Sequence, residues 1–313
     1  MKIGIITILN VNNYGAELQA FALHNKLKQM GYDNEVINYL YYKNPDFKKE
    51  PASKPLIKTN FKNKLKDFVL KWLDKYSSVR YPKIAKIRKQ RFDDFHKQHT
   101  VVSKVYNSYS ALYKAKLEYD TFIVGSDQVW NPNNGTNIAP FFLTFAPKKA
   151  KKIAYASSFG IGDVNQAFYP QYREWLNNIN YLATRESDGV QIIKEVTGRD
   201  AVHVVDPTLL LSKKQWEKIL VPYKSDKPYL LFFVFKKNAF AEDLAYEIQK
   251  QTGYQIIRVC KNEIPLENDK NILNIRDFGP AEFLGLYQKA SFVITTSFHG
   301  SIFSLIFEKP FYT

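Results

Sequence analysis

The feature that most constrains the fold is a repeated alternation between short apolar runs and amphipathic stretches. The chain begins with "KIGIITIL", a continuous β-branched run typical of a strand that is buried on both faces. After a polar loop, apolar residues recur at three- or four-residue spacing from Ala20 to Met30, which predicts a helix ending near Gly31. The next strand is predicted in "NEVINYL", so the chain opens with a β-α-β unit of parallel strands.

The same alternation continues to the end of the chain. Further strands are predicted within "YDTFIVGSDQVW", "KKIAYASSFG", "INYLATRESDG", "AVHVVDPTLLL", "YLLFFVFKKN", "YQIIRVC" and "SFVITTS". Helices are predicted in "FAEDLAYEIQKQTG", "PAEFLGLYQKA" and "SIFSLIFE", and the polar run "VPYKSDKP" is the candidate linker. We therefore expect an α/β protein with two Rossmann-like domains that face a cleft, over residues 1–220 and 221–313.

A lysine-rich segment interrupts the alternation. The 313-residue chain has a net charge of +15, and residues 54–104 hold 15 Lys or Arg against four Asp, a net charge of +11. Apolar spacing predicts helices over about 61–73 and 82–99, so we expect a basic helical insertion of about 54–104 in the first domain. Its lysines form either a solvated face or a surface that attracts anionic lipid or a phosphorylated substrate. No nucleic-acid-binding motif accompanies the charge, so no nucleic-acid partner is expected.

Several classes of protein and site are disfavoured by the sequence. The single cysteine, Cys260, excludes an internal disulfide and a multi-cysteine zinc site. The N-terminus has no small-residue cleavage site, and no run reaches the roughly 18 to 20 apolar residues of a membrane span. The histidines are scattered, and a surface role is expected for His96 and His99. We therefore expect a cytoplasmic protein without a metal site.

Polar residues follow the predicted strands at the positions where open parallel sheets bind ligands, beyond the carboxyl ends of the strands. These candidate site residues are Asn13, Tyr14, Gly15, Ser126, Asp127, Gln128, Ser158, Arg185, Glu186, Lys236, Ser297, His299, Gly300 and Ser301. The alternative is ordinary capping and turn chemistry, because Asn, Ser, Asp and Gly commonly occupy such loops.

Three of these residues have two interpretations each. His299 is either a hydrogen-bonded core residue or a proton-exchanging group beside an anion, since Gly300 and Ser301 are predicted to open a helix whose N–H groups receive an anion. Arg185 either pairs with the adjacent glutamate or binds a carboxylate or phosphate. Asp127 either caps the "QVW" segment or accepts a proton from a substrate hydroxyl. Spacing alone leaves these alternatives open.

Six motifs, taken in order, resemble the polysaccharide pyruvyl transferase family. They are "NNYGAELQAFAL", "IVGSDQVWNP", "IAYASSFG", "TRESDG", "VVDPTLLL" and "SFHGSIFSLIFEKPF", and they span nearly the whole chain. The resemblance implies a fold similar to the type B glycosyltransferases. It also implies transfer of the pyruvyl group of phosphoenolpyruvate, a co-substrate, onto a sugar of a cell-surface polysaccharide precursor, with formation of a ketal and release of phosphate. The acceptor would be a lipid-linked or nucleotide-linked glycan, with peripheral contact at the inner membrane surface and no cofactor.

The resemblance also implies roles for individual residues. His299 matches the family's histidine and would act as acid or base, and Arg185 matches the arginine that anchors the donor's carboxylate or phosphate. Donor binding would be completed by Ser297, Gly300, Ser301 and Lys236. The residues expected to line the acceptor side are Asn13, Tyr14, Gly15, Ser126, Asp127, Gln128, Ser158 and Glu186. Family members usually continue beyond "KPF", so a further helical region is expected after Thr313.

Two other functions fit the same features. A glycosyltransferase that uses a nucleotide sugar would share the fold. A non-catalytic protein that binds glycans or a membrane surface would account for the basic helices. Pyruvyl transfer is the function that the six motifs favour.

Overall fold

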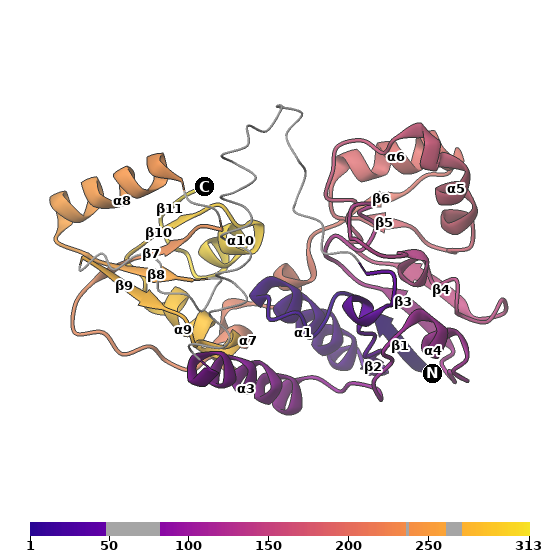
Figure 1. Cartoon of the computed structure of the whole chain (residues 1–313), viewed down its shortest axis with the longest axis horizontal. Coiled ribbons are helices and arrows are strands. Elements are labelled where there is room, and N and C mark those ends of the chain that lie inside the picture. Colours follow the sequence, from indigo (N-terminus) through magenta and orange to yellow (C-terminus); the bar gives the residue numbers. More distant parts are fainter. Residues whose placement is uncertain (48–81, 236–237, 261–270) are drawn as a thin grey trace. The chain divides into compact units, whose positions relative to one another are not determined.

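The computed structural model describes residues 1–47, 82–235, 238–260 and 271–313 (Figure 1). These residues fall into two compact units. The first contains residues 1–47 and 96–211, and the second contains residues 82–95 and the described residues from 212 onward. The predicted helix over about 61–73 and the candidate residue Lys236 lie outside the described residues.

The first unit is built on a parallel sheet. Its strands are β1 (Lys2–Ile6), β2 (Asp33–Val36), β3 (Thr121–Val124) and β4 (Lys151–Ala154). They pair in the order β2-β1-β3-β4, and every pairing is parallel. A second parallel pair, β5 (Ala183–Thr184) with β6 (Val202–His203), is joined to the β4 side by single bridges. The strands predicted from buried apolar runs are therefore present and parallel.

Helices and an aromatic core complete the first unit. The α-helices are α1 (Tyr14–Gln29), α4 (Tyr109–Tyr113), α5 (Tyr169–Asn177) and α6 (Ser187–Thr197). The 3-10 helices are η1 (Tyr41–Lys43), η2 (Ala139–Phe142), η3 (Gln166–Phe168) and η4 (Pro207–Leu210). In the core, the fully buried Trp130 stacks on Phe142 with ring centroids 5.1 Å apart. The predicted first helix is confirmed as α1, whereas α4 and α5 were not predicted from the sequence.

The second unit has a parallel sheet of its own. Its strands are β7 (Tyr229–Phe233), β8 (Gln255–Val259), β9 (Ile272–Ile275), β10 (Phe292–Thr295) and β11 (Phe311–Tyr312). They pair in the order β11-β10-β7-β8-β9, and every pairing is parallel. All five residues of β7 are buried, as expected of a central strand covered on both faces. The sequence did not predict β9 or β11.

Helices lie on both faces of this second sheet. They are α7 (Lys213–Glu217), α8 (Ala239–Thr252), α9 (Pro280–Lys289) and α10 (Phe298–Ile306). Figure 1 shows α8 and α9 on opposite sides of the sheet. Alternate residues of β7 pack on opposite faces of the sheet. Leu230 and Phe232 share a core cluster with Ala241 of α8, while the ring of Phe233 contacts that of Phe283 of α9. This alternation is the two-residue period of a strand.

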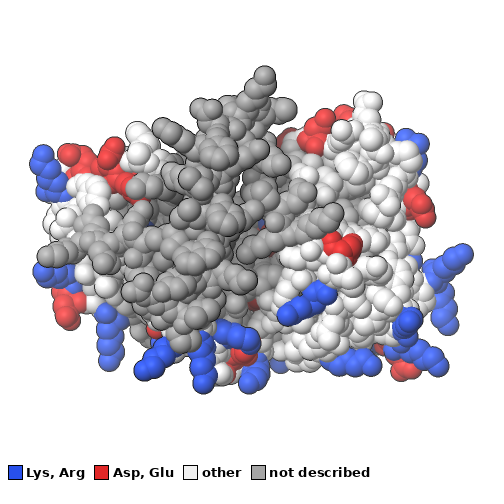
Figure 2. Space-filling model, viewed as in Figure 1, with Lys and Arg blue, Asp and Glu red and all other residues white. Residues whose placement is uncertain are grey.

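The basic segment contributes the helix α3 (Pro82–His99), with the bounds that the sequence predicted. Its arginines bind other parts of the protein: Arg88 donates to the Cys260 carbonyl oxygen at 2.8 Å, and Arg91 pairs with Asp277 at 3.0 Å and with Glu282 at 3.2 Å. The exposed basic residues of the helix are Lys83, Lys86, Lys89 and Lys97. Figure 2 shows Lys and Arg side chains along the lower edge of the face in view. The helix therefore combines an arginine side that packs on protein with a lysine side that faces solvent.

The expected surface role of His96 is wrong. His96 is buried, and its Nε2 lies 2.6 Å from Oε2 of Glu17, a carboxylate that is also buried. The partner is 79 positions away in the sequence, so helical spacing within α3 gave no sign of it. Burial of an acidic side chain in a core is tolerated when such a partner is present.

None of the helices among the described residues is long and apolar enough to cross a membrane.

Candidate functional site

The strand order of each sheet marks one position for a ligand. In the first unit, chain order along the sheet reverses between β1 and β3, and in the second unit it reverses between β7 and β10. Open parallel sheets bind ligands outside the carboxyl ends of the strands that flank such a reversal. The candidate residues of the sequence follow these strands, or the β4–β6 strands beside them.

Strained backbone conformations are concentrated in the loops at the carboxyl ends of the strands of the first sheet. Four residues other than glycine have positive φ there: Asn10 (59°) and Asn12 (52°) after β1, Asp127 (72°) after β3 and Ala156 (54°) after β4. Such conformations are uncommon for residues with a side chain and cluster at binding and catalytic sites. The loops that follow three neighbouring strands of the sheet, β1, β3 and β4, therefore share a feature typical of a functional site.

Asp127 does not cap a helix, contrary to one interpretation of the sequence. The residues that follow it form turns, and its Oδ1 accepts a hydrogen bond from the N–H of Gln128 at 2.9 Å. Its carbonyl oxygen accepts the N–H of Ser158 at 3.1 Å, which joins the loops after β3 and β4. The left-handed backbone of Asp127 thus fixes two neighbouring loops of the site.

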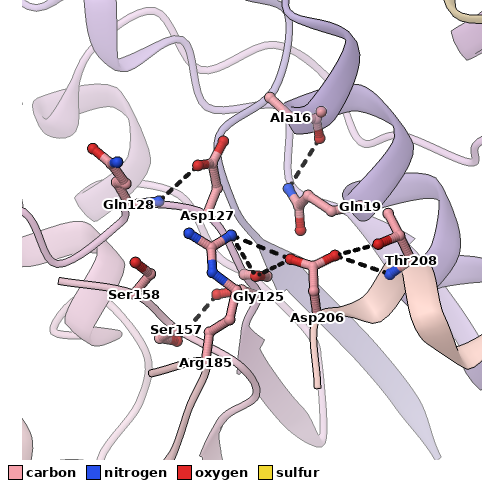
Figure 3. A network of polar contacts seen from close by, with 12 residues as sticks. Ala16, Gln19, Gly125, Asp127, Gln128, Ser157, Ser158, Arg185, Asp206 and Thr208 are labelled. Atoms are coloured by element: carbon pink, nitrogen blue, oxygen red, sulfur yellow. Dashed lines mark hydrogen bonds and ion pairs between the residues drawn. The ribbon is translucent and has the colours of Figure 1, made fainter. Parts of the chain in front are cut away.

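Arg185 lies at the centre of a polar network at the end of β5. Its Nε is 3.2 Å from Oε1 of Glu186, and its Nη1 is 3.2 Å from Oδ2 of Asp206 and 3.5 Å from Oγ of Ser126. Figure 3 shows its guanidinium between Asp127 and Asp206. The pairing of Arg185 with the adjacent glutamate is therefore observed, and Asp206 is a second acidic partner.

The electrostatics of this network keep Arg185 charged. Its side chain is only 7% exposed, and this burial lowers its pKa. The negative charges of Asp206, Asp127 and Glu186 outweigh burial, so that the pKa of Arg185 lies above its ordinary value. A guanidinium held by carboxylates on two sides has a fixed orientation and a permanent charge.

Asp206 is the member of this network that the sequence did not indicate. It is 1% exposed, and both of its carboxylate oxygens are occupied. Oδ1 accepts from the N–H and the hydroxyl of Thr208 at 3.0 and 2.7 Å, and Oδ2 accepts from Ser126 at 2.8 Å as well as from Arg185. The only sign in the sequence is its position three residues after the end of β6, at the start of "DPTLLL".

Ser158 and Glu186 form the other arm of the network. Ser158 is fully buried, and its Oγ donates to Oε1 of Glu186 at 2.5 Å while accepting the N–H of Gly160 at 3.0 Å. Glu186 is the residue before the first turn of α6, where the helix dipole favours a negative charge. Ser126, Ser158, Arg185 and Glu186, all candidates from the sequence, thus lie in one connected group.

The remaining candidates of the first unit have structural roles at the same edge. Asn13 caps α1, with its Oδ1 accepting the N–H of Gly15 at 3.0 Å, and Tyr14 is buried as the first residue of that helix. Gln128 is exposed and accepts a hydrogen bond from Asn131 at 3.1 Å. Asn13 has the capping role that the alternative interpretation allowed.

In the second unit, the start of α10 differs from the prediction. The helix begins at Phe298, three residues before Ser301, because Ser297 is its N-cap and accepts the N–H of Gly300 at 3.2 Å. The N–H of Ser301 donates to the carbonyl oxygen of Ser297 at 2.9 Å. The N–H groups that begin the helix are therefore those of Phe298 and His299, rather than those of Gly300 and Ser301.

His299 lies in the first turn of α10, directly after β10. It is 9% exposed, and its ring meets the ring of Phe298 edge-on at 5.1 Å. Gly300 allows this turn to approach the sheet, because a Cβ at that position would lie 2.2 Å from Oγ1 of Thr295. The fold thus holds His299 at the point where the strand order of the second sheet reverses.

The comparisons with solved structures show the fold. The UDP-GlcNAc 2-epimerase from Methanocaldococcus jannaschii matches with a TM-score of 0.50 and 14% identity, over 99% of this chain and 83% of that chain. An α-glucosyltransferase solved with UDP and a 13-mer DNA matches with a TM-score of 0.53 and 11% identity, over 94% of this chain and 72% of that chain. These similarities confirm the predicted α/β fold of the type B glycosyltransferase class.

At the level of sequence, no match is found among curated proteins. The profile of the family described as polysaccharide pyruvyl transferase matches residues 13–313, which include both groups of polar residues described above. This match confirms the resemblance predicted from the six motifs. The chain belongs to the polysaccharide pyruvyl transferase family.

Proposed function

We propose that this protein transfers the pyruvyl group of phosphoenolpyruvate to a sugar of a cell-surface polysaccharide precursor. The product is a ketal that bridges two sugar hydroxyls, and phosphate is released. The observation that carries the proposal is the family match over residues 13–313, because it includes both Arg185 and His299. The proposal needs no cofactor, since phosphoenolpyruvate itself is the activated donor.

The reaction sets clear demands on the site. Protonation of the donor's methylene carbon creates cationic character at the adjacent carbon, which one sugar hydroxyl attacks. The second hydroxyl then replaces phosphate at the same carbon. One hydroxyl proton is balanced by the new methyl hydrogen and the other leaves with phosphate, so the site has to move protons without net release.

His299 is the proposed proton carrier. An imidazole exchanges protons near neutral pH, and a positioned acid or base contributes roughly 10²- to 10⁴-fold to such a step. The support for this role is its place at the strand-order reversal of the second sheet and its match to the family's histidine. The N–H groups that begin α10 provide positive potential beside it.

Arg185 is proposed to hold the donor's carboxylate or phosphate. Its carboxylate neighbours fix its orientation and keep it charged, which suits recognition of a planar anion. They also reduce its attraction for an anion, so Arg185 supplies part of the donor's binding energy. Loss of a charge-assisted hydrogen bond costs about 1.5–3 kcal/mol, or roughly 10- to 100-fold in affinity.

The acceptor is proposed to be a lipid-linked or nucleotide-linked glycan that is modified in the cytoplasm. The exposed lysines of α3 support contact with anionic lipid head groups at the inner membrane surface, because clustered lysines are attracted to such a surface. The remaining candidates at the edge of the first sheet offer hydroxyl, amide and carboxylate groups that suit a sugar.

Two variants test the proposed roles in a phosphate-release assay with phosphoenolpyruvate and a galactoside or mannosaminide acceptor. We expect His299→Ala to abolish turnover with an intact circular dichroism spectrum. We expect Arg185→Ala to raise the donor's KM by roughly 10- to 100-fold. Arg199→Ala is the matched control, because its guanidinium bonds main-chain carbonyls elsewhere in the first unit. A near-normal rate for His299→Ala, or an unchanged donor KM for Arg185→Ala, contradicts the corresponding role.

A further inference from the structure

The carboxylate of Glu186 has one occupied and one unoccupied oxygen. Oε1 accepts from Oγ of Ser158 at 2.5 Å and from Nε of Arg185 at 3.2 Å. Oε2 is buried, and no group among the described residues donates a hydrogen bond to it. A buried polar oxygen without a partner costs about 1–3 kcal/mol and calls for an explanation.

Asp206 provides an internal comparison. It lies in the same network and has the same charge, but all four of its hydrogen bonds are made and both of its oxygens are occupied. Asp206 therefore has the pattern of a residue that holds other side chains in place. Glu186 differs because its second oxygen keeps its capacity to accept a hydrogen bond.

The surroundings fix the position of this second oxygen. Oε1 is held by a serine that is itself fully buried and accepts the N–H of Gly160, so the carboxylate has little freedom to turn. The start of α6 favours its negative charge. The Glu186 side chain is 35% exposed although Oε2 itself is buried, and shielding of Oε2 from water strengthens any hydrogen bond it accepts.

We propose that Glu186 is a catalytic residue of the pyruvyl transfer, an inference that rests on the proposed function. Oε2 accepts a hydrogen bond from a hydroxyl of the sugar acceptor. As the hydroxyl oxygen uses an electron pair to bond the donor's cationic carbon, its O–H bond breaks and the proton passes to Oε2. When the carbon–oxygen bond to phosphate breaks, the electron pair leaves with phosphate, which takes the proton from Oε2 and restores the carboxylate. The second hydroxyl bonds the carbon in place of phosphate, and its proton restores His299.

This assignment separates the acid and base tasks of the reaction between two side chains. His299 delivers the proton to the methylene carbon, and Glu186 removes one from the attacking hydroxyl. A hydroxyl is a weak nucleophile until a base accepts its proton, so the loss of Glu186 affects the rate of the chemical step more than the binding of the donor.

The test compares Glu186→Gln with the wild-type protein, using phosphoenolpyruvate and the same galactoside or mannosaminide acceptor. We expect kcat to fall by roughly 10²- to 10⁴-fold, as for loss of a general base. The donor's KM should stay within about threefold, because the amide oxygen of glutamine can still accept from Ser158 and from Nε of Arg185 and so keeps Arg185 in place. Glu174→Gln, at an exposed glutamate on α5 of the same unit, is the matched control with unchanged kinetics.

Three results decide the inference. A wild-type protein that turns over, beside a Glu186→Gln variant whose kcat stays within threefold, overturns the role of Glu186 and leaves the proposed function standing. A wild-type protein that transfers no pyruvyl group overturns the proposed function and this inference with it. Glu186→Asp keeps a carboxylate and guards against misfolding of the glutamine variant: a kcat that is reduced but above that of the glutamine variant supports the role, and an undiminished kcat contradicts it.

Discussion

Replacement of Asp206 by alanine tests how much the polar network around Arg185 contributes to the stability of the first unit. The change removes a carboxylate that is 1% exposed and accepts four hydrogen bonds. It leaves the Arg185 guanidinium, with a side chain that is 7% exposed, with the negative charges of Glu186 and Asp127 but without that of Asp206. The variant therefore creates a partly uncompensated buried charge.

The expected loss in the free energy of unfolding follows from that charge. Breaking a buried ion pair by removing one partner costs about 3–5 kcal/mol. The hydroxyls of Ser126 and Thr208 lose their acceptor at the same time, which adds to the upper end of this range. Urea unfolding followed by circular dichroism measures the effect as a lower midpoint of the first unit's transition.

A double-mutant cycle separates the ion pair from the loss of packing. Arg185→Met removes the charge that Asp206→Ala leaves behind, so the double variant should be more stable than the sum of the single effects by about 1–3 kcal/mol. Asp200→Ala serves as the control, because this exposed carboxylate pairs with Lys194 at the surface and its loss should leave the midpoint unchanged. The account is refuted if Asp206→Ala costs less than about 1 kcal/mol, or if the two effects simply add.

Two further predictions concern packing and pH. Gly300→Ala would place a Cβ 2.2 Å from Oγ1 of Thr295, and we expect a loss of about 1–3 kcal/mol in thermal stability together with reduced turnover, as α10 shifts away from the sheet. His24 is buried between Asn34 and the N–H of Val101, and burial lowers its pKa below 6.5. The unfolded chain therefore binds a proton at His24 more readily, so the contribution of His24 to stability is complete above pH 6.5 and is lost as the pH falls through the lowered pKa. Unfolding midpoints measured from pH 7.5 to 5 should decrease less in a folded His24→Asn variant than in the wild type, and equal slopes would contradict this role.

The sequence predicted the layout of the strands well because their signal is local. Continuous apolar runs such as that of β7 indicate strands buried on both faces. Open parallel sheets bind ligands beyond the carboxyl ends of such strands, so polar residues at those ends are candidate site residues. Ser126, Ser158, Arg185 and Glu186 were identified in this way, without knowledge of their partners.

What the sequence did not predict depends on packing between distant segments. The contact of Asp206 with Ser126 spans 80 positions, and no local pattern distinguishes such an aspartate from a turn residue. His96 was misjudged for the same reason, because its acidic partner lies in α1. The start of α10 was placed three residues late, since a helix can begin near either serine of "SFHGS" until the hydrogen bond of Ser297 is seen.

The most direct measurement of the central claim is a single reaction in D2O. The protein is mixed with phosphoenolpyruvate and a galactoside or mannosaminide acceptor, and phosphorus and proton magnetic resonance follow the products. The proposed function predicts one phosphate released for each pyruvate ketal formed, with one deuterium in the ketal methyl group, because that carbon takes its third hydrogen from solvent. Phosphate without a ketal, a ketal whose methyl group contains no deuterium, or an unconsumed donor would contradict the account.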